Sequence, residues 1–119
     1  MFEVEVTVPL RFRHSLEGFG ERFSKPHSHT WDVTVVSGAK EVDNRGVSVD
    51  FVELKQTLAG LLEPFQGQLL NSHEPFTETQ PTAENIARLV AELLGKSYPG
   101  LVHSVTVGSG EERARFTPG

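Results

Sequence analysis

Three of the five histidines in this sequence have a spacing that suits metal coordination. His27 and His29 are two residues apart, so on a β-strand their side chains point to the same face. That face continues into apolar residues at the next odd positions, which are Trp31, Val33 and Val35. His14 ends an earlier alternating segment whose apolar residues fall at even positions: Val4, Val6, Val8, Leu10 and Phe12. If the two segments pair as an antiparallel hairpin, three imidazoles converge at its end.

Neutral imidazole is a good ligand for zinc, which binds histidine nitrogen at about 2.0–2.1 Å. Three protein ligands leave the fourth tetrahedral position open to water or substrate, as in catalytic rather than structural zinc sites. The alternative for His27 and His29 is a pair of half-buried histidines that are satisfied by hydrogen bonds. A third histidine, His14, in matching register favours the metal site.

The elements that position these histidines follow from the periodicity of the chain. Residues 2–14 alternate as a strand, and Pro9 on its polar side predicts an edge position or a bulge, because proline cannot donate to the ladder. Residues 15–26 contain Gly18, Gly20 and Pro26 and predict a mobile loop or flap. Residues 27–38 form the second strand, and residues 43–46 have turn chemistry.

Two helices and two further strands complete the prediction. Asp50 is the N-cap of a helix that Pro64 and Gly67 end, and its apolar stripe is Phe51, Leu54, Leu58, Leu61, Leu62 and Phe65. Thr82 caps a second helix, which Gly95 terminates, with the stripe Ile86, Leu89, Val90, Leu93 and Leu94. Residues 101–107 alternate as a third strand, and residues 112–117 form a short fourth. The order β-β-α-α-β-β predicts an α+β fold, with both helices on one face of a four-stranded antiparallel sheet.

Composition narrows the class of protein. A length of 119 residues predicts a single domain over residues 1–119. The net charge of −5 and the lack of a basic cluster argue against nucleic acid as a partner. No apolar run approaches the roughly 20 residues that span a bilayer, and residues 1–5 do not resemble a signal peptide, so we expect no membrane partner and a cytoplasmic location. Cysteine is absent, which excludes disulfides and thiolate chemistry.

The order of elements and several motifs together resemble the 6-pyruvoyl-tetrahydropterin synthase / 6-carboxytetrahydropterin synthase family, which has the tunnelling fold. His14 lies where the family has its first zinc histidine, and His27-Ser28-His29 corresponds to its His-Gly-His. Other similar segments are Gly46 to Lys55, Leu70-Asn71, and Pro81 to Ala87. The resemblance spans nearly the whole chain. It implies bound Zn²⁺, a pterin-like small-molecule ligand, and a homo-oligomer, either a trimer or a hexamer.

The chain departs from this family at the residues that carry its usual chemistry. Phe23 occupies the place of the catalytic cysteine, Gln66 and Gly67 that of an Asp-His pair, and Ser109 that of the glutamate that anchors the pterin. Some members use a glutamate near the place of the cysteine, which makes Glu21 a candidate catalytic carboxylate; the alternative is a solvated loop residue.

Other polar residues are candidates for lesser roles. His73 follows the missing Asp-His pair and is a second catalytic candidate, or else an exposed loop histidine. Thr82 lies in a segment that lines the pterin pocket in the family, although capping alone explains it, so Thr82 and Ser109 are candidate substrate-binding residues. Glu111 or Glu112 takes the anchoring role if the turn at 108–110 shifts the register; otherwise they are charges at a hairpin tip. His103 we expect to be a hydrogen-bonded core or interface histidine.

Three functions remain open from the sequence. The first is a zinc-dependent lyase of this family with altered chemistry, acting on a pterin or a related heterocycle. The second is a homologue that binds zinc and a pterin without turnover. The third is a structural oligomer that zinc stiffens. Fold-level resemblance does not choose between them, because one fold carries many functions.

Overall fold

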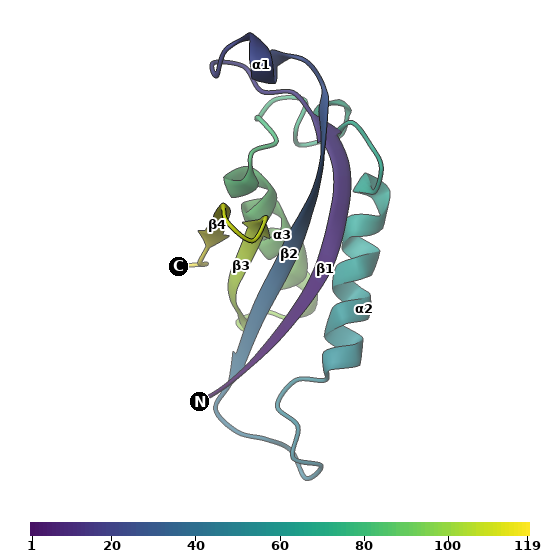
Figure 1. Cartoon of the computed structure of the whole chain (residues 1–119). Coiled ribbons are helices and arrows are strands. Elements are labelled where there is room, and N and C mark those ends of the chain that lie inside the picture. The colour runs from purple at the N-terminus through teal and green to yellow at the C-terminus, as the bar shows by residue number, and fades with distance from the viewer.

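The computed structural model describes all residues, 1–119, and a long antiparallel hairpin dominates it (Figure 1). Strands β1 (Phe2–His14) and β2 (His27–Ala39) pair along their whole length, with His14 opposite His27. Pro9 lies in β1, which is an edge strand and pairs with β2 without a bulge, so the first of the two predicted alternatives holds. From Val4 to His14 the even residues of β1 are buried and the odd ones are exposed, so the predicted face of this strand is confirmed.

Two shorter strands complete a sheet of order β1-β2-β3-β4, and all neighbours are antiparallel. They are β3 (Val102–Gly108) and β4 (Arg113–Phe116), close to the predicted ranges. The turn between them requires glycine at position 108. Gly108 has φ 149°, and a Cβ there would collide with the carbonyl oxygen of Glu112.

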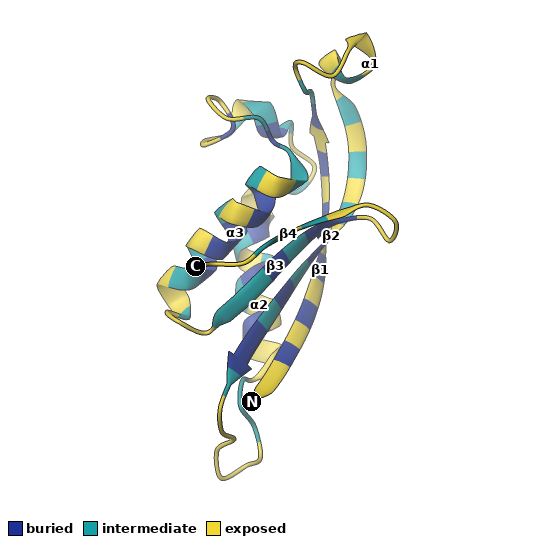
Figure 2. Cartoon of the chain, turned by 90° about the vertical axis from the view of Figure 1, so that its left-hand side faces the viewer, coloured by how far each residue is buried: buried dark blue, intermediate teal, exposed yellow.

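Helices α2 (Phe51–Leu62) and α3 (Ala83–Ser97) cover one face of the sheet, as Figure 2 shows. Both predicted N-caps are confirmed. The Asp50 carboxylate accepts hydrogen bonds from the backbone N–H groups of Val52 and Glu53, and the Thr82 hydroxyl accepts one from Asn85. The α+β prediction with two helices on one face is therefore correct.

Three local predictions were wrong. Gly95 does not end α3, because a glycine weakens a helix without breaking it; the helix continues to Ser97, and the Tyr98 N–H bonds to the carbonyl of Leu94. The predicted flap contains one helical turn, α1 (Glu21–Ser24). Phe51 is 63% exposed rather than part of the buried stripe, since it starts α2 and lines a surface cavity.

Two 3-10 turns, η1 (Glu63–Phe65) and η2 (Leu70–Ser72), lie in the segment between α2 and α3.

One hydrophobic core of 19 buried residues lies between the sheet and the helices. The sheet contributes residues such as Leu10, Val35 and Val107, which are at most 1% exposed. The helices contribute the i, i+4 series that the sequence predicted: Leu54, Leu58 and Leu62 from α2, and Ile86, Val90 and Leu94 from α3. None of the helices combines the length and the apolar composition needed to cross a bilayer.

Side-chain amides brace the β1 edge and the chain that follows it. Gln66 accepts a hydrogen bond from the Arg11 N–H and donates one to the Pro9 carbonyl. Asn71 makes the same pair of bonds with the N–H and carbonyl of Ser15. Gln80 does so with Glu17. Each carboxamide thus offers one donor and one acceptor, as a backbone peptide group of a neighbouring strand does.

Candidate metal centre and adjoining pocket

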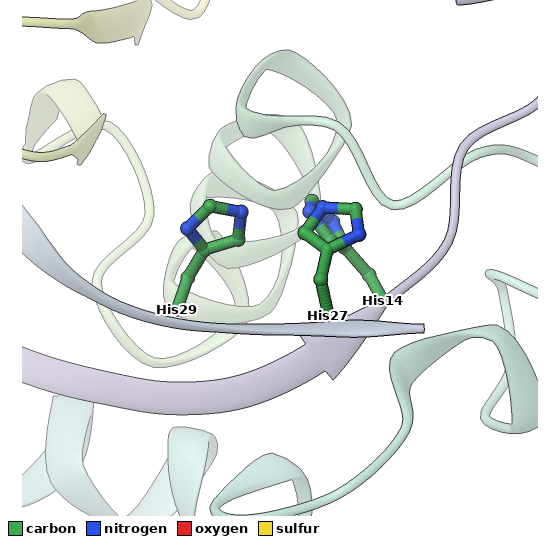
Figure 3. Close-up of side chains that lie close together, drawn as sticks. All are labelled: His14, His27 and His29. Atoms are coloured by element: carbon green, nitrogen blue, oxygen red, sulfur yellow. The ribbon is translucent and has the colours of Figure 1, made fainter. Parts of the chain in front are cut away.

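The hairpin brings His14, His27 and His29 together as predicted. One ligand nitrogen from each ring lies within 4.8 Å of the others, and no cysteine, aspartate or glutamate belongs to this group. Figure 3 shows the three rings on one side of the hairpin, with His14 from β1 and the other two from β2. The convergence follows from the register, because His14 is opposite His27 and His29 shares its face.

Hydrogen bonds leave two ring nitrogens available to a ligand. Nδ1 of His14 donates to the carbonyl of Pro81 at 2.8 Å, and Nδ1 of His27 donates to the carbonyl of Lys25 at 2.9 Å. A carbonyl can only accept, so in the neutral rings the proton is on Nδ1 and the lone pair is on Nε2. Both Nε2 atoms are buried and have no hydrogen-bond partner. A buried, unpartnered acceptor is unfavourable unless a ligand satisfies it.

Aromatic side chains hold the rings in place. The His29 ring stacks on Trp31, with centroids 4.7 Å apart and an interplanar angle of 29°. Phe12 packs its ring edge-on against His14 at 5.1 Å. Phe23 contacts the His27 ring from the flap, with a centroid separation of 5.9 Å. These contacts restrict ring rotation, which is what a preorganised ligand set requires.

The surroundings keep the imidazoles of His14 and His29 neutral. The pKa of His14 is lowered to about 4. Burial is the main cause; the Pro81 carbonyl raises the pKa in part, and the neighbouring His27 and His29 add to the lowering. Burial also lowers the pKa of His29, and His27 adds to this effect. Neutral imidazole is the form that binds a metal. The three residues therefore fit a divalent transition metal, and an all-nitrogen set with one open position fits zinc.

A pocket of about 470 Å³ adjoins the histidine cluster. His29 and Trp31 form part of its wall, and the two predicted substrate-binding residues, Thr82 and Ser109, both line it. Of the two glutamates that follow Ser109, only Glu112 is among the lining residues. The structure thus brings residues from β2, the start of α3 and the β3–β4 turn to one cavity.

Sequence reasoning missed several residues of this pocket. Glu84, Arg113, Leu16 and Phe19 line it as well. A signal for Glu84 was present, because it lies two residues after the predicted N-cap in a segment already singled out by its resemblance. No pattern in the sequence marked Arg113, whose place depends on the turn at Gly108.

The two candidate catalytic residues lie apart from this pocket. Glu21 is exposed at the start of α1, and His73 is half-buried with its ring 5.9 Å from that of Phe65; neither is among the pocket-lining residues. Gln66 and Gly67 lie along the β1 edge, where Gln66 is held by its two backbone hydrogen bonds. His103 is a partner of Glu3 at 3.2 Å and is not part of the histidine cluster.

Comparisons with known proteins agree with this fold. The model of the 6-pyruvoyl tetrahydropterin synthase family matches residues 3–115. The chain is 32% identical over 71 residues to the 6-carboxy-5,6,7,8-tetrahydropterin synthase of Bacillus subtilis, which is 56% of this chain and 47% of that protein. It is 30% identical over 80 residues to the dihydroneopterin monophosphate aldolase of Pyrococcus furiosus, which is 67% of this chain and 65% of that protein.

These matches span about half and just under two thirds of the two relatives. The fold is similar to that of the Caenorhabditis elegans 6-pyruvoyl tetrahydropterin synthase, with a TM-score of 0.85 and 22% identity over 99% of this chain and 96% of that one. Because the family match covers nearly the whole sequence, the chain belongs to the 6-pyruvoyl tetrahydropterin synthase family.

Proposed function

We propose that this protein is a zinc-dependent lyase that acts on the side chain of a pterin or a related heterocycle. The observation that carries the proposal is the pair of buried Nε2 atoms, on His14 and His27, that have no partner within the chain. Two relatives named above are a tetrahydropterin synthase and an aldolase, which supports lyase chemistry on a pterin.

His14, His27 and His29 would hold the metal. Zinc bound there supplies a Lewis acid that polarises a hydroxyl or carbonyl group of the substrate. The chain itself would keep His14 and His29 neutral, fix the orientation of the three rings, and present the open side of the cluster to the neighbouring pocket through His29.

The pocket would bind the heterocycle. Thr82 and Ser109 offer hydroxyl groups, and Trp31 offers an aromatic surface. Glu112 is the carboxylate that we assign to the anchoring role in place of the family's glutamate. A carboxylate can accept two N–H hydrogen bonds from the edge of a 2-amino-pyrimidinone. Glu112 lines the pocket together with Ser109, which supports the assignment.

Proton transfer is proposed for one of three residues. Glu84 is exposed but lines the pocket. Glu21 reaches the pocket only if the flap folds toward the pocket, and His73 only if the segment between α2 and α3 moves toward it. A general base must come within hydrogen-bond reach of its proton, directly or through one water. The variants Glu84→Gln, Glu21→Gln and His73→Ala test this choice. The proton-transfer residue is the one whose replacement abolishes turnover while the metal content stays the same.

The test of the function is a screen of dihydropterins with zinc-loaded protein. We expect a side-chain product to be released. Turnover should be lost when a chelator removes the metal and should recover when zinc is added back. Pterin-dependent stabilisation without any product would refute the lyase and leave a binding protein. If neither binding nor turnover is detected with one metal per chain, only the structural function remains.

The alternative without turnover is supported by one observation. Gln66 occupies the position of a family acid-base residue. Both its amide oxygen and its amide nitrogen are hydrogen-bonded to the backbone of β1. A residue fixed in this way is a structural brace and is not free to exchange protons. The product assay above separates the two functions.

We also propose a homo-oligomer, a trimer or a hexamer. The molecule is elongated, with extents of 55 × 25 × 23 Å, and the outer strand β4 has a neighbour on one side only. Open strand edges favour pairing with another chain. Phe51 and Val52 are 63% and 65% exposed, and burial of such side chains on association would stabilise an assembly. Sedimentation measures the mass directly.

A further inference from the structure

The flap between β1 and β2 has a tip, residues 18–22, that lies beside the pocket of the candidate site. All residues of the tip are exposed, and Phe19 is the only one of them that lines the pocket. The side chain of Phe19 is 57% exposed. Burial of aromatic surface is favourable, so this ring would gain from contact with a molecule bound in the pocket.

Hydrogen bonds hold the base of the flap on both sides of the tip. The side-chain amide of Gln80 accepts a bond from the Glu17 N–H and donates one to the Glu17 carbonyl. The Leu16 N–H donates to the carbonyl of Phe23, which joins the outgoing chain to the returning chain. The Phe23 ring in turn contacts that of His27. The base is therefore tied to the body of the protein and to the histidine cluster.

The tip, in contrast, has the backbone of a hinge. Gly18 and Gly20 flank Phe19 and have φ angles of 88° and 94°. An added Cβ would meet nothing within 4 Å at either glycine, so no neighbour restricts the backbone there. Neither Gly18 nor Phe19 makes a hydrogen bond to another residue. A glycine on each side allows rotation about the backbone with little steric resistance.

The ring of Phe19 is also held more loosely than the other aromatic ring of the pocket. Its centroid lies 6.5 Å from that of Phe23, at an interplanar angle of 75°. Trp31, on the β2 wall of the pocket, stacks on His29 with centroids 4.7 Å apart. Figure 1 shows the flap, with α1, projecting from the end of the hairpin. The pocket thus combines a fixed aromatic wall with an aromatic group on a glycine-flanked tip.

We propose that residues 18–20 are a lid, with Phe19 as its cover, that closes over a heterocycle bound in the pocket. The inference rests on the proposed function, since the lid closes on that ligand. Rotation at Gly18 and Gly20 brings the Phe19 ring from water onto the ligand, while Glu17 stays clamped by Gln80. The closed lid excludes water from the ligand and slows its release. Phe19 therefore acts on ligand retention and not on proton transfer.

Release rates test the lid on zinc-loaded full-length protein, with neopterin as the probe and its fluorescence followed by stopped flow. Phe19→Ala is expected to raise the dissociation rate about tenfold and to change the association rate less than about threefold, because the lost contact forms only after binding. Phe19→Tyr keeps the ring and is expected to stay within about twofold of the unmodified protein. An unchanged dissociation rate in Phe19→Ala overturns the lid.

The matched control is Phe2→Ala. Phe2 is 50% exposed and lies at the other end of the hairpin from the flap, as Figure 1 shows for the N-terminus. Its replacement removes a similar exposed ring and is expected to leave both rates within about twofold. Equal acceleration of dissociation in Phe2→Ala and Phe19→Ala would mean a general loss of stability, which refutes a role specific to Phe19.

Hydrogen exchange of the backbone amides, measured by NMR, reports closure directly. Residues 18–20 are expected to exchange rapidly in the free protein and about tenfold or more slowly at saturating neopterin. The Glu17 amide, which is bonded to Gln80, is expected to be protected in both states. Exchange of residues 18–20 that stays fast with neopterin bound overturns the lid and leaves the proposed function intact.

Two further outcomes would also overturn the lid. A protein that holds one zinc per chain but binds no neopterin refutes the proposed function and the lid together. Protection of residues 18–20 in the free protein that disappears on dilution would mean that a second copy of the chain covers the tip. The lid requires instead that this protection follow the concentration of neopterin and not that of the protein.

Discussion

Nδ1 of His14 lies 2.8 Å from the carbonyl oxygen of Pro81 and donates a hydrogen bond to it. This contact joins the end of β1 to the residue that precedes the N-cap of α3. It fixes which nitrogen of His14 can bind a metal, and it ties the metal cluster to the helix start whose residues line the neighbouring pocket.

The three histidines are predicted to bind one metal ion per chain. His27→Ala and His29→Ala each remove one of three ligands, so we expect zinc content to fall below about a tenth of that of the unmodified protein at equal free metal. His103→Ala, which changes a histidine outside the cluster, is the matched control and retains the metal. Elemental analysis after gel filtration measures this, and unchanged zinc in His29→Ala would contradict the site.

The metal-free protein is predicted to lose stability as the pH falls. The pKa of His14 is about 4 in the fold against 6.5 in the unfolded chain, so between these values only the unfolded chain takes up the proton. The contribution of His14 is complete above pH 6.5 and is lost as the pH falls toward 4, on the order of 3 kcal/mol in all.

Denaturant unfolding at several pH values, with a chelator present, measures this loss. His14→Gln removes the titrating group and is expected to flatten the dependence between pH 6.5 and 4.5, whereas His103→Gln is expected to keep it. An equally steep fall in both variants would assign the pH dependence to other groups.

Gly108 is predicted to control the pocket as well as the fold. Gly108→Ala places a Cβ against the Glu112 carbonyl in a backbone conformation that alanine rarely adopts, so we expect a loss of about 1–3 kcal/mol and weaker pterin binding. Gly110→Ala, two residues away with open space around it, is the matched control. Calorimetry of both variants, with and without a pterin, makes the test; equal melting temperatures would contradict it.

Asn71 is predicted to brace the hairpin through both polar atoms of its amide. Asn71→Asp keeps the acceptor for the Ser15 N–H but sets a carboxylate oxygen against the Ser15 carbonyl, so we expect a loss of about 1–3 kcal/mol at pH 7. Protonation of the carboxyl restores a donor, and the difference from the unmodified protein should therefore shrink below about pH 4. Unfolding curves at the two pH values check both statements.

The elements were predictable wherever burial imposes a period. The alternation of β1 and β2 and the caps at Asp50 and Thr82 depend on near neighbours in the chain, and the structure has them. The end of α3 was misplaced because Gly95 is only a weak terminator, and Phe51 was misplaced because periodicity does not tell where the sheet stops covering a helix.

The candidate site likewise has one part that the sequence could predict, the histidine cluster, and one that it could not, the pocket. The histidine cluster needed only a hairpin register, which the two alternating segments define. The pocket needed the β3–β4 turn and the start of α3 to meet β2, and such contacts between distant segments leave no mark in local pattern. Glu84 and Arg113 were missed for this reason, and the roles of Glu21 and His73 remain predictions.

The side-chain amides of Gln66, Asn71 and Gln80 act as substitutes for a missing strand beside β1 and the residues after it. The scaffold that holds the three imidazoles is therefore finished by groups from the same polypeptide. It follows that an isolated subunit, diluted until any assembly has dissociated, should still capture its ion, even if chemistry on a substrate requires several copies.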